Sequence, residues 1–200
     1  MSSTDPTPAV PSEMLVVDSP YEVARWRPLV NWVLFIPHAI ILSPLRAVAG
    51  AVWFINWVIL IFTGRLNTGL YGFMAMYERY NQRAGGFLLG FSEDYAPFDF
   101  GMGPHDNDAY PPVRVTLPEV PETTPRTAAF NFFLAIPHYI VIALIGIGAF
   151  FVLLAGWFAV IFTGAWPQGM RDFLVRFGNY YLRVWAYVAM VHTNYPRFGL

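Results

Sequence analysis

The sequence contains one pattern twice, and this duplication limits the folds that the chain can adopt. The block from Asn31 to Gly64 reads NWVLFIPHAIILSPLRAVAGAVWFINWVILIFTG. One hundred positions later, the block from Asn131 to Gly164 reads NFFLAIPHYIVIALIGIGAFFVLLAGWFAVIFTG. The same register continues through Gly69 and Gly169, Phe73 and Phe173, Tyr80 and Tyr180, Arg83 and Arg183, Tyr95 and Tyr195, and Phe98 and Phe198. An internal repeat of this kind predicts two copies of one structural unit.

The composition predicts a membrane protein. Hydrophobic residues make up 56% of the 200 residues and charged residues only 12%, about half the charged share of an ordinary soluble domain. The net charge of −1 gives no electrostatic reason to expect a nucleic-acid partner. The absence of cysteine from the sequence excludes thiol catalysis and cysteine-based metal sites.

The N-terminal residues 1–24 are expected to form a disordered tail. Residues 1–22 contain acidic residues and several prolines but no Lys or Arg, whereas a secretory signal needs a basic segment before its apolar one. The apolar surface of this stretch is too small to offset the entropy of ordering it. The chain then divides into membrane unit one at 25–98, a connector rich in Pro and acidic residues at 99–125, and membrane unit two at 126–200.

Each apolar block is predicted to form a short transmembrane helical hairpin. One continuous helix would be roughly 50 Å long, well beyond a hydrocarbon core of about 30 Å. Helix breakers stand near the middle of each block, at Pro44 and Gly50 in the first and at Gly146 and Gly148 in the second. Two crossings of about 16 residues each are short, however, so a kinked, steeply tilted single span is the alternative.

The placement of the arginines supports the hairpins. If each block crosses twice, Arg46 alone lies at a hairpin apex and the other arginines share one side of the membrane. Because positively charged loops stay in the cytoplasm, the N-terminus, the connector and the C-terminus are all predicted to be cytoplasmic.

An amphipathic stretch follows each apolar block. Between Gly69 and Phe91, apolar residues fall on one helical stripe, and Glu78 and Arg79 belong to the opposite, polar stripe. Such helices lie in the membrane interface with arginine toward lipid phosphate, although the apolar stripe could instead pack on the hairpins. The candidates for binding lipid phosphate are Arg79, Arg83, Arg171, Arg176 and Arg183.

The connector contributes no predicted site. It is expected to be extended and rich in turns, with one short strand at 113–117. His105, Asp106 and Asp108 suggest a metal-binding loop, but without further ligands at fixed spacing a turn is favoured. No metal is predicted.

The order of motifs resembles a known family. The motifs are IPH, IFTG, the glycine after it, the amphipathic stretch with arginines, and the closing Tyr95-Ala96-Pro97-Phe98 and Tyr195-Pro196-Arg197-Phe198. Together, over about residues 25–198, they resemble domain-of-unknown-function family 4389, small integral membrane proteins common in actinobacteria. The resemblance implies a bacterial plasma-membrane location and two tandem copies of the family domain. It implies no reaction and no catalytic residue.

The duplicated polar residues in the apolar blocks are Asn31, His38, Asn131 and His138. If the two units pack about a pseudo-twofold axis, the two histidines could face each other and bind a haem or a metal. Because each histidine lies near the start of its helix, an anchor at the membrane interface is favoured, or a hydrogen bond to a carbonyl freed by Pro37 or Pro137. No cofactor is therefore predicted.

The sequence as a whole predicts a non-enzymatic, all-α integral membrane protein. Its expected role is that of an accessory or scaffold subunit in a larger membrane complex, or of an organiser of anionic lipid. The expected partners are the lipid bilayer and other membrane proteins. The alternative is a small transporter or lipid-handling protein with a site between the two repeats. A redox subunit that binds haem or metal is less favoured.

Overall fold

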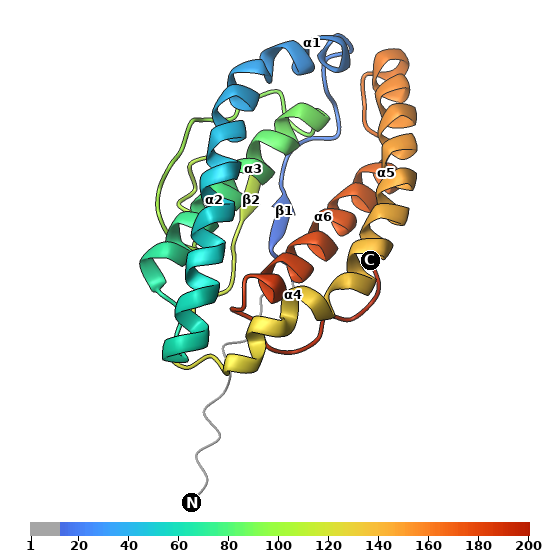
Figure 1. Ribbon diagram of the computed structural model, residues 1–200. Coiled ribbons are helices and arrows are strands. Elements are labelled where there is room, and N and C mark those ends of the chain that lie inside the picture. Colours follow the sequence, from blue (N-terminus) through green and yellow to red (C-terminus); the bar gives the residue numbers. More distant parts are fainter. Residues whose placement is uncertain (1–12) are drawn as a thin grey trace, which may run out of the picture.

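The computed structural model describes residues 13–200 and shows a mostly helical protein (Figure 1). Its elements are β1 (Leu15–Val17), α1 (Arg27–Leu34), α2 (Ile36–Thr63), α3 (Thr68–Leu89), β2 (Val113–Val115), the 3-10 helix η1 (Arg126–Phe130), α4 (Asn131–Leu134), α5 (Ile136–Thr163) and α6 (Gln168–Val188). In each repeat a short helix leads into a long apolar helix, and a third helix packs back against it. The extensive α2–α3 and α5–α6 contacts define the two repeat units.

Each apolar block contains one long helix. The predicted hairpins are therefore wrong, and the alternative of a single long helix describes each block. α2 and α5 each contain 28 residues and are about 42 Å long. Pro37 and Pro137 lie in the first helical turn, where a missing N–H costs nothing. The chain bends before them, at Phe35 and Ala135. α2 continues through Pro44, which was predicted to break it. The interior glycines cost only about 1 kcal/mol each, too little to break a helix that packs along its neighbour.

The two repeats close head to tail into a circuit. α1 and α2 of the first repeat contact α5 and η1 of the second, and α4 joins η1 to α5. We call α1, α2, η1, α4 and α5 the frame, which runs around the molecule in Figure 1. The closures are alike: the Trp57 indole N–H donates to the Ala129 carbonyl at 2.9 Å, and that of Trp157 to the Leu89 carbonyl at 2.9 Å.

Two left-handed glycines end the long helices at these closures. Gly64 has φ 73° and Gly164 has φ 77°. The side chain of Arg126 lies against the first, and that of Arg25 lies against the second. Each repeat therefore places an arginine over the helix end of the other repeat.

The second layer consists of α3, α6 and a two-stranded antiparallel ribbon. β1 pairs with β2 in the register Leu15 to Val115. β2 packs on α3, and β1 packs on α6. The Asn179 side chain on α6 accepts hydrogen bonds from the backbone N–H groups of Met14 and Leu15 and donates to the Leu15 carbonyl.

This ribbon corrects the prediction of a disordered tail. Residues 13–24 are ordered, and Met14 is buried, because their short apolar run finds a partner strand in the connector. Residues 1–12 of the predicted tail lie outside the described residues.

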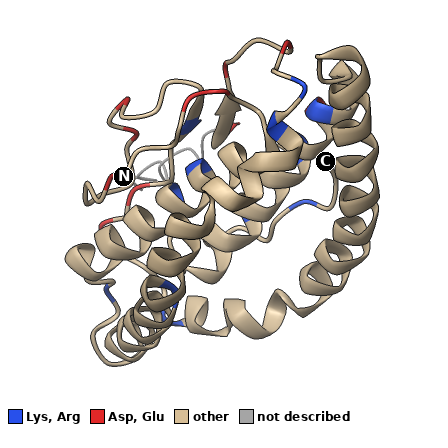
Figure 2. Ribbon diagram, turned by 90° about the horizontal axis from the view of Figure 1, so that it is seen from above, with Lys and Arg blue, Asp and Glu red and all other residues tan. Residues whose placement is uncertain are grey.

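The frame has the character of a membrane surface. α2 and the helical stretch Arg126–Thr163 are each long and apolar enough to cross a membrane, and only 17% and 11% of their most apolar parts are buried. Charged side chains gather over the side that carries the loops, whereas long helical stretches on the other side carry none (Figure 2). Within these helices, α5 has no charged residue and α2 has only Arg46.

α3 is not the surface helix that its amphipathic pattern suggests. Its apolar stripe packs on α2, and its polar stripe is covered by the connector, so that Glu78, Arg79 and Arg83 are all buried. The alternative in which the apolar stripe packs within the protein describes α3 better than an interfacial helix.

Candidate functional site

Each duplicated histidine lies in an aromatic cluster of its own repeat. His38 is fully buried, and its Nδ1 lies 2.8 Å from the Tyr80 hydroxyl. The Phe98 ring stacks on it at 4.6 Å between centroids, and the Tyr95 ring lies at 4.9 Å. The closing motif Tyr95-Ala96-Pro97-Phe98 thus folds back over the start of α2.

The second repeat builds the same cluster. His138 is fully buried, and its Nδ1 lies 2.7 Å from the Tyr180 hydroxyl. Phe198 stacks on it at 4.2 Å and Tyr195 lies at 4.8 Å. The rings around each histidine come from its own repeat, so the less favoured alternative, in which the two histidines face each other over one haem or metal, does not describe this arrangement.

The favoured prediction for the histidines also needs correction. Each is buried, so neither is an anchor at the membrane interface, and each pairs with a tyrosine hydroxyl in place of a carbonyl freed by proline. Asn31 and Asn131 lie nearby: their side-chain amides donate to the carbonyls of Phe87 and Tyr187 at 2.8 and 2.9 Å. The asparagines tie the short helices α1 and α4 to the ends of α3 and α6, and the histidines tie the starts of α2 and α5 to the interior of α3 and α6.

Replacing either His38 or His138 with Gln should therefore lower the free energy of unfolding of the protein. Glutamine keeps a donor and an acceptor but loses the stacked rings, which contribute roughly 1 kcal/mol per aromatic pair. We expect about 1–3 kcal/mol per site and additivity within about 0.5 kcal/mol, because the clusters share no contact. Thermal unfolding of both single variants and the double variant measures this. A double variant no worse than either single variant would contradict two separate clusters.

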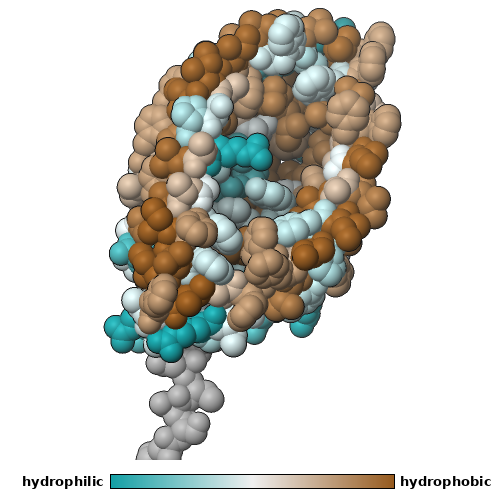
Figure 3. All heavy atoms as spheres, viewed as in Figure 1, coloured by the Kyte–Doolittle hydropathy of each residue, from teal (hydrophilic) through white to brown (hydrophobic). Residues whose placement is uncertain are grey.

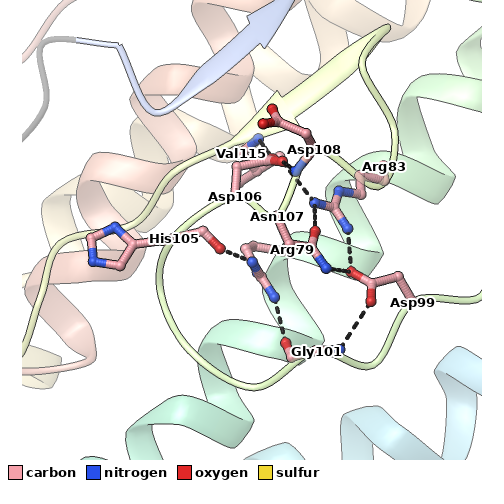
Figure 4. A network of polar contacts seen from close by, with 9 residues as sticks. All are labelled: Arg79, Arg83, Asp99, Gly101, His105, Asp106, Asn107, Asp108 and Val115. Atoms are coloured by element: carbon pink, nitrogen blue, oxygen red, sulfur yellow. Dashed lines mark hydrogen bonds and ion pairs between the residues drawn. The ribbon is translucent and has the colours of Figure 1, made fainter.

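Two of the arginines predicted to bind lipid phosphate form a buried polar network with the connector (Figure 4). Arg83 is fully buried and pairs with Asp99 at 2.6 Å and Asp106 at 3.1 Å. It also donates to the Asn107 side chain at 2.8 Å. Arg79, 2% exposed, donates to the backbone carbonyls of Gly101 and His105. Neither guanidinium faces lipid, so the lipid-phosphate prediction does not hold for these two.

The loop that suggested a metal site belongs to this network. Asp106 accepts the backbone N–H groups of Asp108 at 2.7 Å and Val115 at 2.6 Å, which is the favoured turn. Among residues 13–200, no three His, Asp or Glu side chains are grouped to hold a metal ion.

The remaining three arginines differ from one another in exposure. Arg171 is 2% exposed and donates to the Ser19 and Pro20 carbonyls, both at 2.8 Å. Arg183 is partly buried and donates to the Gly199 carbonyl at 2.5 Å. Arg176 on α6 is exposed. Of the five arginines predicted to bind lipid phosphate, it is the one whose position fits that contact.

A cavity lies between the two repeats, inside the frame. It has a volume of about 430 Å³, within the range of small-molecule sites. α3, α5, α6 and the β-ribbon supply its walls. A second cavity of about 360 Å³ continues along α5 and α6, and Tyr181 lines both. Figure 3 shows the hollow, with hydrophobic side chains around it and hydrophilic ones inside.

The lining of the cavity is mostly apolar, and its two amide side chains lie together on α3. Asn81 and Gln82 of α3 line it, and Gln82 donates to the buried Glu78 carboxylate at 2.7 Å. We call Asn81 and Gln82 the polar wall; Glu78 is buried behind it. The apolar wall belongs to repeat two and comprises Gly146, Ala149, Phe150, Leu153, Leu174, Phe177 and Gly178.

Burial raises the pKa of the Glu78 carboxyl from its ordinary 4.5 to about 7, because the charged form loses its water. The charge of Glu78 is in turn the largest cause of the raised pKa of Tyr181 on α6. The same tyrosine is influenced by Arg46 of α2. Of these three residues, Tyr181 lines the cavity, and the charges of Glu78 and Arg46 act on it from α3 and α2.

Ionisation of Glu78 should destabilise the folded protein. The folded pKa is raised, so this contribution to stability is complete below about pH 4.5 and is lost as the pH rises through about 7. The loss is on the order of 3 kcal/mol. Thermal unfolding from pH 4.5 to 8 should show the wild type losing stability relative to Glu78→Gln. A constant difference between the two proteins across this range would refute the raised pKa.

Comparison of the repeats explains why the cavity has two different walls. Arg46 and Glu78 of repeat one correspond to Gly146 and Gly178 of repeat two, and both glycines line the cavity. At these two positions repeat one carries charged side chains and repeat two carries glycine. The missing side chains leave space for the cavity on the side of repeat two. The two repeats therefore contribute differently to the cavity: repeat one supplies the polar wall, and repeat two supplies the apolar wall.

A model of a domain of unknown function, DUF4389, matches the chain twice, over residues 25–101 and 125–199. The chain belongs to the DUF4389 family. No curated protein and no solved structure is significantly similar to it. The resemblance expected from the motifs is therefore confirmed as two tandem DUF4389 copies, and their description assigns no activity to the cavity.

The cavity of this DUF4389 protein lies where the alternative prediction placed a site, between the two repeats, but none of the predicted site residues lines it. Residues identical in both copies, such as His38 and His138, hold each repeat together. The cavity is formed where the copies differ, and an alignment of one half against the other shows those differences at Arg46 and Glu78.

Proposed function

We propose that this protein is a non-enzymatic membrane protein that binds an anionic amphiphile with an acyl chain between its two repeats. The observation that carries the proposal is the cavity with one polar and one apolar wall, enclosed by a frame of exposed apolar helices. This geometry favours the lipid-handling role over that of a general scaffold.

The two walls suit the two ends of such a ligand. The apolar wall and the second cavity along α6 offer Ala149, Phe150 and Leu153 to an acyl chain, whose burial contributes about 0.8 kcal/mol per methylene. The polar wall offers the side-chain amides of Asn81 and Gln82 to a head group. The positive charge of Arg46 favours an anionic head, and a protonated Glu78 adds no repulsion.

Filling the cavity should displace the ligand. A side chain at Gly146 would extend past its only close neighbour, the Phe177 ring, at 3.7 Å. Gly146→Leu should therefore occupy the space that an acyl chain needs. Gly148→Leu is the matched control, because Gly148 lies on the same helix, is exposed and has no atom near its missing Cβ.

Native mass spectrometry of protein released from mild detergent measures the occupancy. We expect a lipid adduct on the wild type and on Gly148→Leu, and at least a tenfold smaller adduct on Gly146→Leu. The mass of the adduct distinguishes a free fatty acid from a phospholipid. Equal adducts on all three proteins would place the lipid outside the cavity and overturn the proposal.

An accessory role in a larger membrane complex is the second candidate, because the exposed apolar faces of α2 and α5 could also contact another membrane protein. Such a partner would be held along the frame and not in the cavity. Gly148→Leu should then weaken the complex, whereas Gly146→Leu should leave it intact.

The proposed location is the bacterial plasma membrane, with the charged side of the protein facing the cytoplasm. The concentration of charged residues over the side that carries the loops supports this orientation (Figure 2). The predicted multi-pass topology stays a separate question, because one long helix in each repeat could still give two crossings of the bilayer.

A further inference from the structure

We infer that the frame lies flat in one leaflet of a lipid bilayer, with α2 and α5 along the membrane plane and the β-ribbon side in water. In this arrangement neither long helix crosses the bilayer. The inference concerns the surface that contacts lipid and does not depend on whether the cavity holds an amphiphile.

The path of the connector excludes α2 as a simple membrane span. α3 ends beside α1, where Asn31 donates to the Phe87 carbonyl. The connector ends at the opposite end of α2, where Arg126 donates to the Phe62 carbonyl. Residues 90–125 therefore run the whole length of α2 with little regular structure. If α2 crossed the bilayer, this segment would have to cross it too.

The connector cannot lie in hydrocarbon. Exposed irregular backbone leaves polar groups without partners, and lipid cannot satisfy them. Its exposed acidic residues are Glu93, Asp94, Asp108, Glu119 and Glu122. A charged side chain at the bilayer centre costs roughly 3 kcal/mol or more. The polar network of Arg83, near the middle of α3, would lie at the same depth.

The two ends of the molecule also argue against a spanning arrangement, because they expose apolar side chains where head groups or water would surround them. α1 exposes 61% of Leu29 and 57% of Trp32, and around α4 the exposed fractions are 63% for Phe130 and 56% for Phe133. These helices lie at the two ends of α2 and α5, which a spanning arrangement would place in the head groups or in water. In a flat arrangement they share one apolar surface with the long helices.

The flat arrangement also matches the charges and dimensions of an interface. An interfacial helix buries its apolar face about 5–10 Å deep, near the head groups. Exposed Arg25, Arg65 and Arg126 lie at the corners of the frame, where α2 and α5 begin or end. There they can reach lipid phosphates, while the uncharged faces of α2 and α5 contact acyl chains.

Single cysteines test the arrangement, since the chain has no native cysteine. Asp94→Cys and Glu122→Cys mark the two ends of the connector, and both positions are exposed. In sealed vesicles, both should react with an impermeant maleimide from the same side. Reaction of the two positions from opposite sides would show that the molecule spans the bilayer and overturn the inference.

Phe151→Cys, 63% exposed near the middle of α5, measures depth. A fluorophore there should be quenched more strongly by a spin label high on the lipid chain than by one at the chain end. Stronger quenching by the deep label would indicate a spanning α5. Protection from water without quenching by either label would indicate a protein partner. Ready reaction of Phe151→Cys with the aqueous maleimide would rule out embedding. Loss of the adduct in Gly146→Leu bears only on the cavity.

Discussion

Replacing Arg83 with Met should lower the free energy of unfolding by about 3–5 kcal/mol. The guanidinium is fully buried between Asp99 and Asp106, and its loss leaves two carboxylates in a site that was built for a cation. Breaking a buried ion pair from one side is among the most destabilising single changes, because the remaining charge has no partner. Thermal or denaturant unfolding in detergent measures the loss.

Arg176→Met is the matched control for this prediction. Arg176 lies on α6 and is exposed, so its replacement should change stability by less than about 0.5 kcal/mol. A loss below about 1 kcal/mol for Arg83→Met would mean that the network contributes little to holding the connector on α3.

Replacing Gly156 with Asn, the residue at the equivalent position of repeat one, should cost more than about 3 kcal/mol. A Cβ at Gly156 would lie 2.1 Å from the Trp166 ring. That ring is 3% exposed and is fixed by a hydrogen bond from its N–H to the Gly90 carbonyl at 2.8 Å, so it cannot move aside. Overpacking of this kind costs a few kcal/mol.

A second change should rescue this variant. Repeat one places Asn56 and Leu66 where repeat two has Gly156 and Trp166. Gly156→Asn combined with Trp166→Leu restores the combination of repeat one, so the double variant should be more stable than Gly156→Asn alone. A double-mutant cycle measures this coupling. Additive losses would show that the two repeats do not pack these positions in the same way.

The duplication made the two-unit, helical architecture predictable. The positions shared by both copies, including His38, Tyr80 and Phe98, proved to be the contacts that hold each unit together. The hairpin prediction failed because it weighed breakers by residue type. α2 continues through Pro44, and the interior glycines cost little in a helix that packs along its neighbour.

The prediction that the arginines of α3 bind lipid phosphate failed for a different reason. A polar stripe on a helix shows only that something polar lies against it, and water, lipid phosphate and protein carboxylates give the same pattern. The partners of Arg83 lie 16 and 23 residues away in a connector that shows no periodicity. The pairing of Leu15–Val17 with Val113–Val115 is equally non-local, so the local composition of residues 1–24 could not indicate it.

Photo-crosslinking is the most direct test of an amphiphile bound between the repeats. A fatty acid with a diazirine at its chain end is added to the protein in vesicles, irradiated, and mapped by peptide mass spectrometry. We expect adducts on the residues that line the cavity, such as Leu153, Leu174 and Phe177, and their loss in Gly146→Leu but not in Gly148→Leu. Adducts spread over the outer faces of α2 and α5, with none in the cavity and no response to Gly146→Leu, would contradict a ligand site between the repeats.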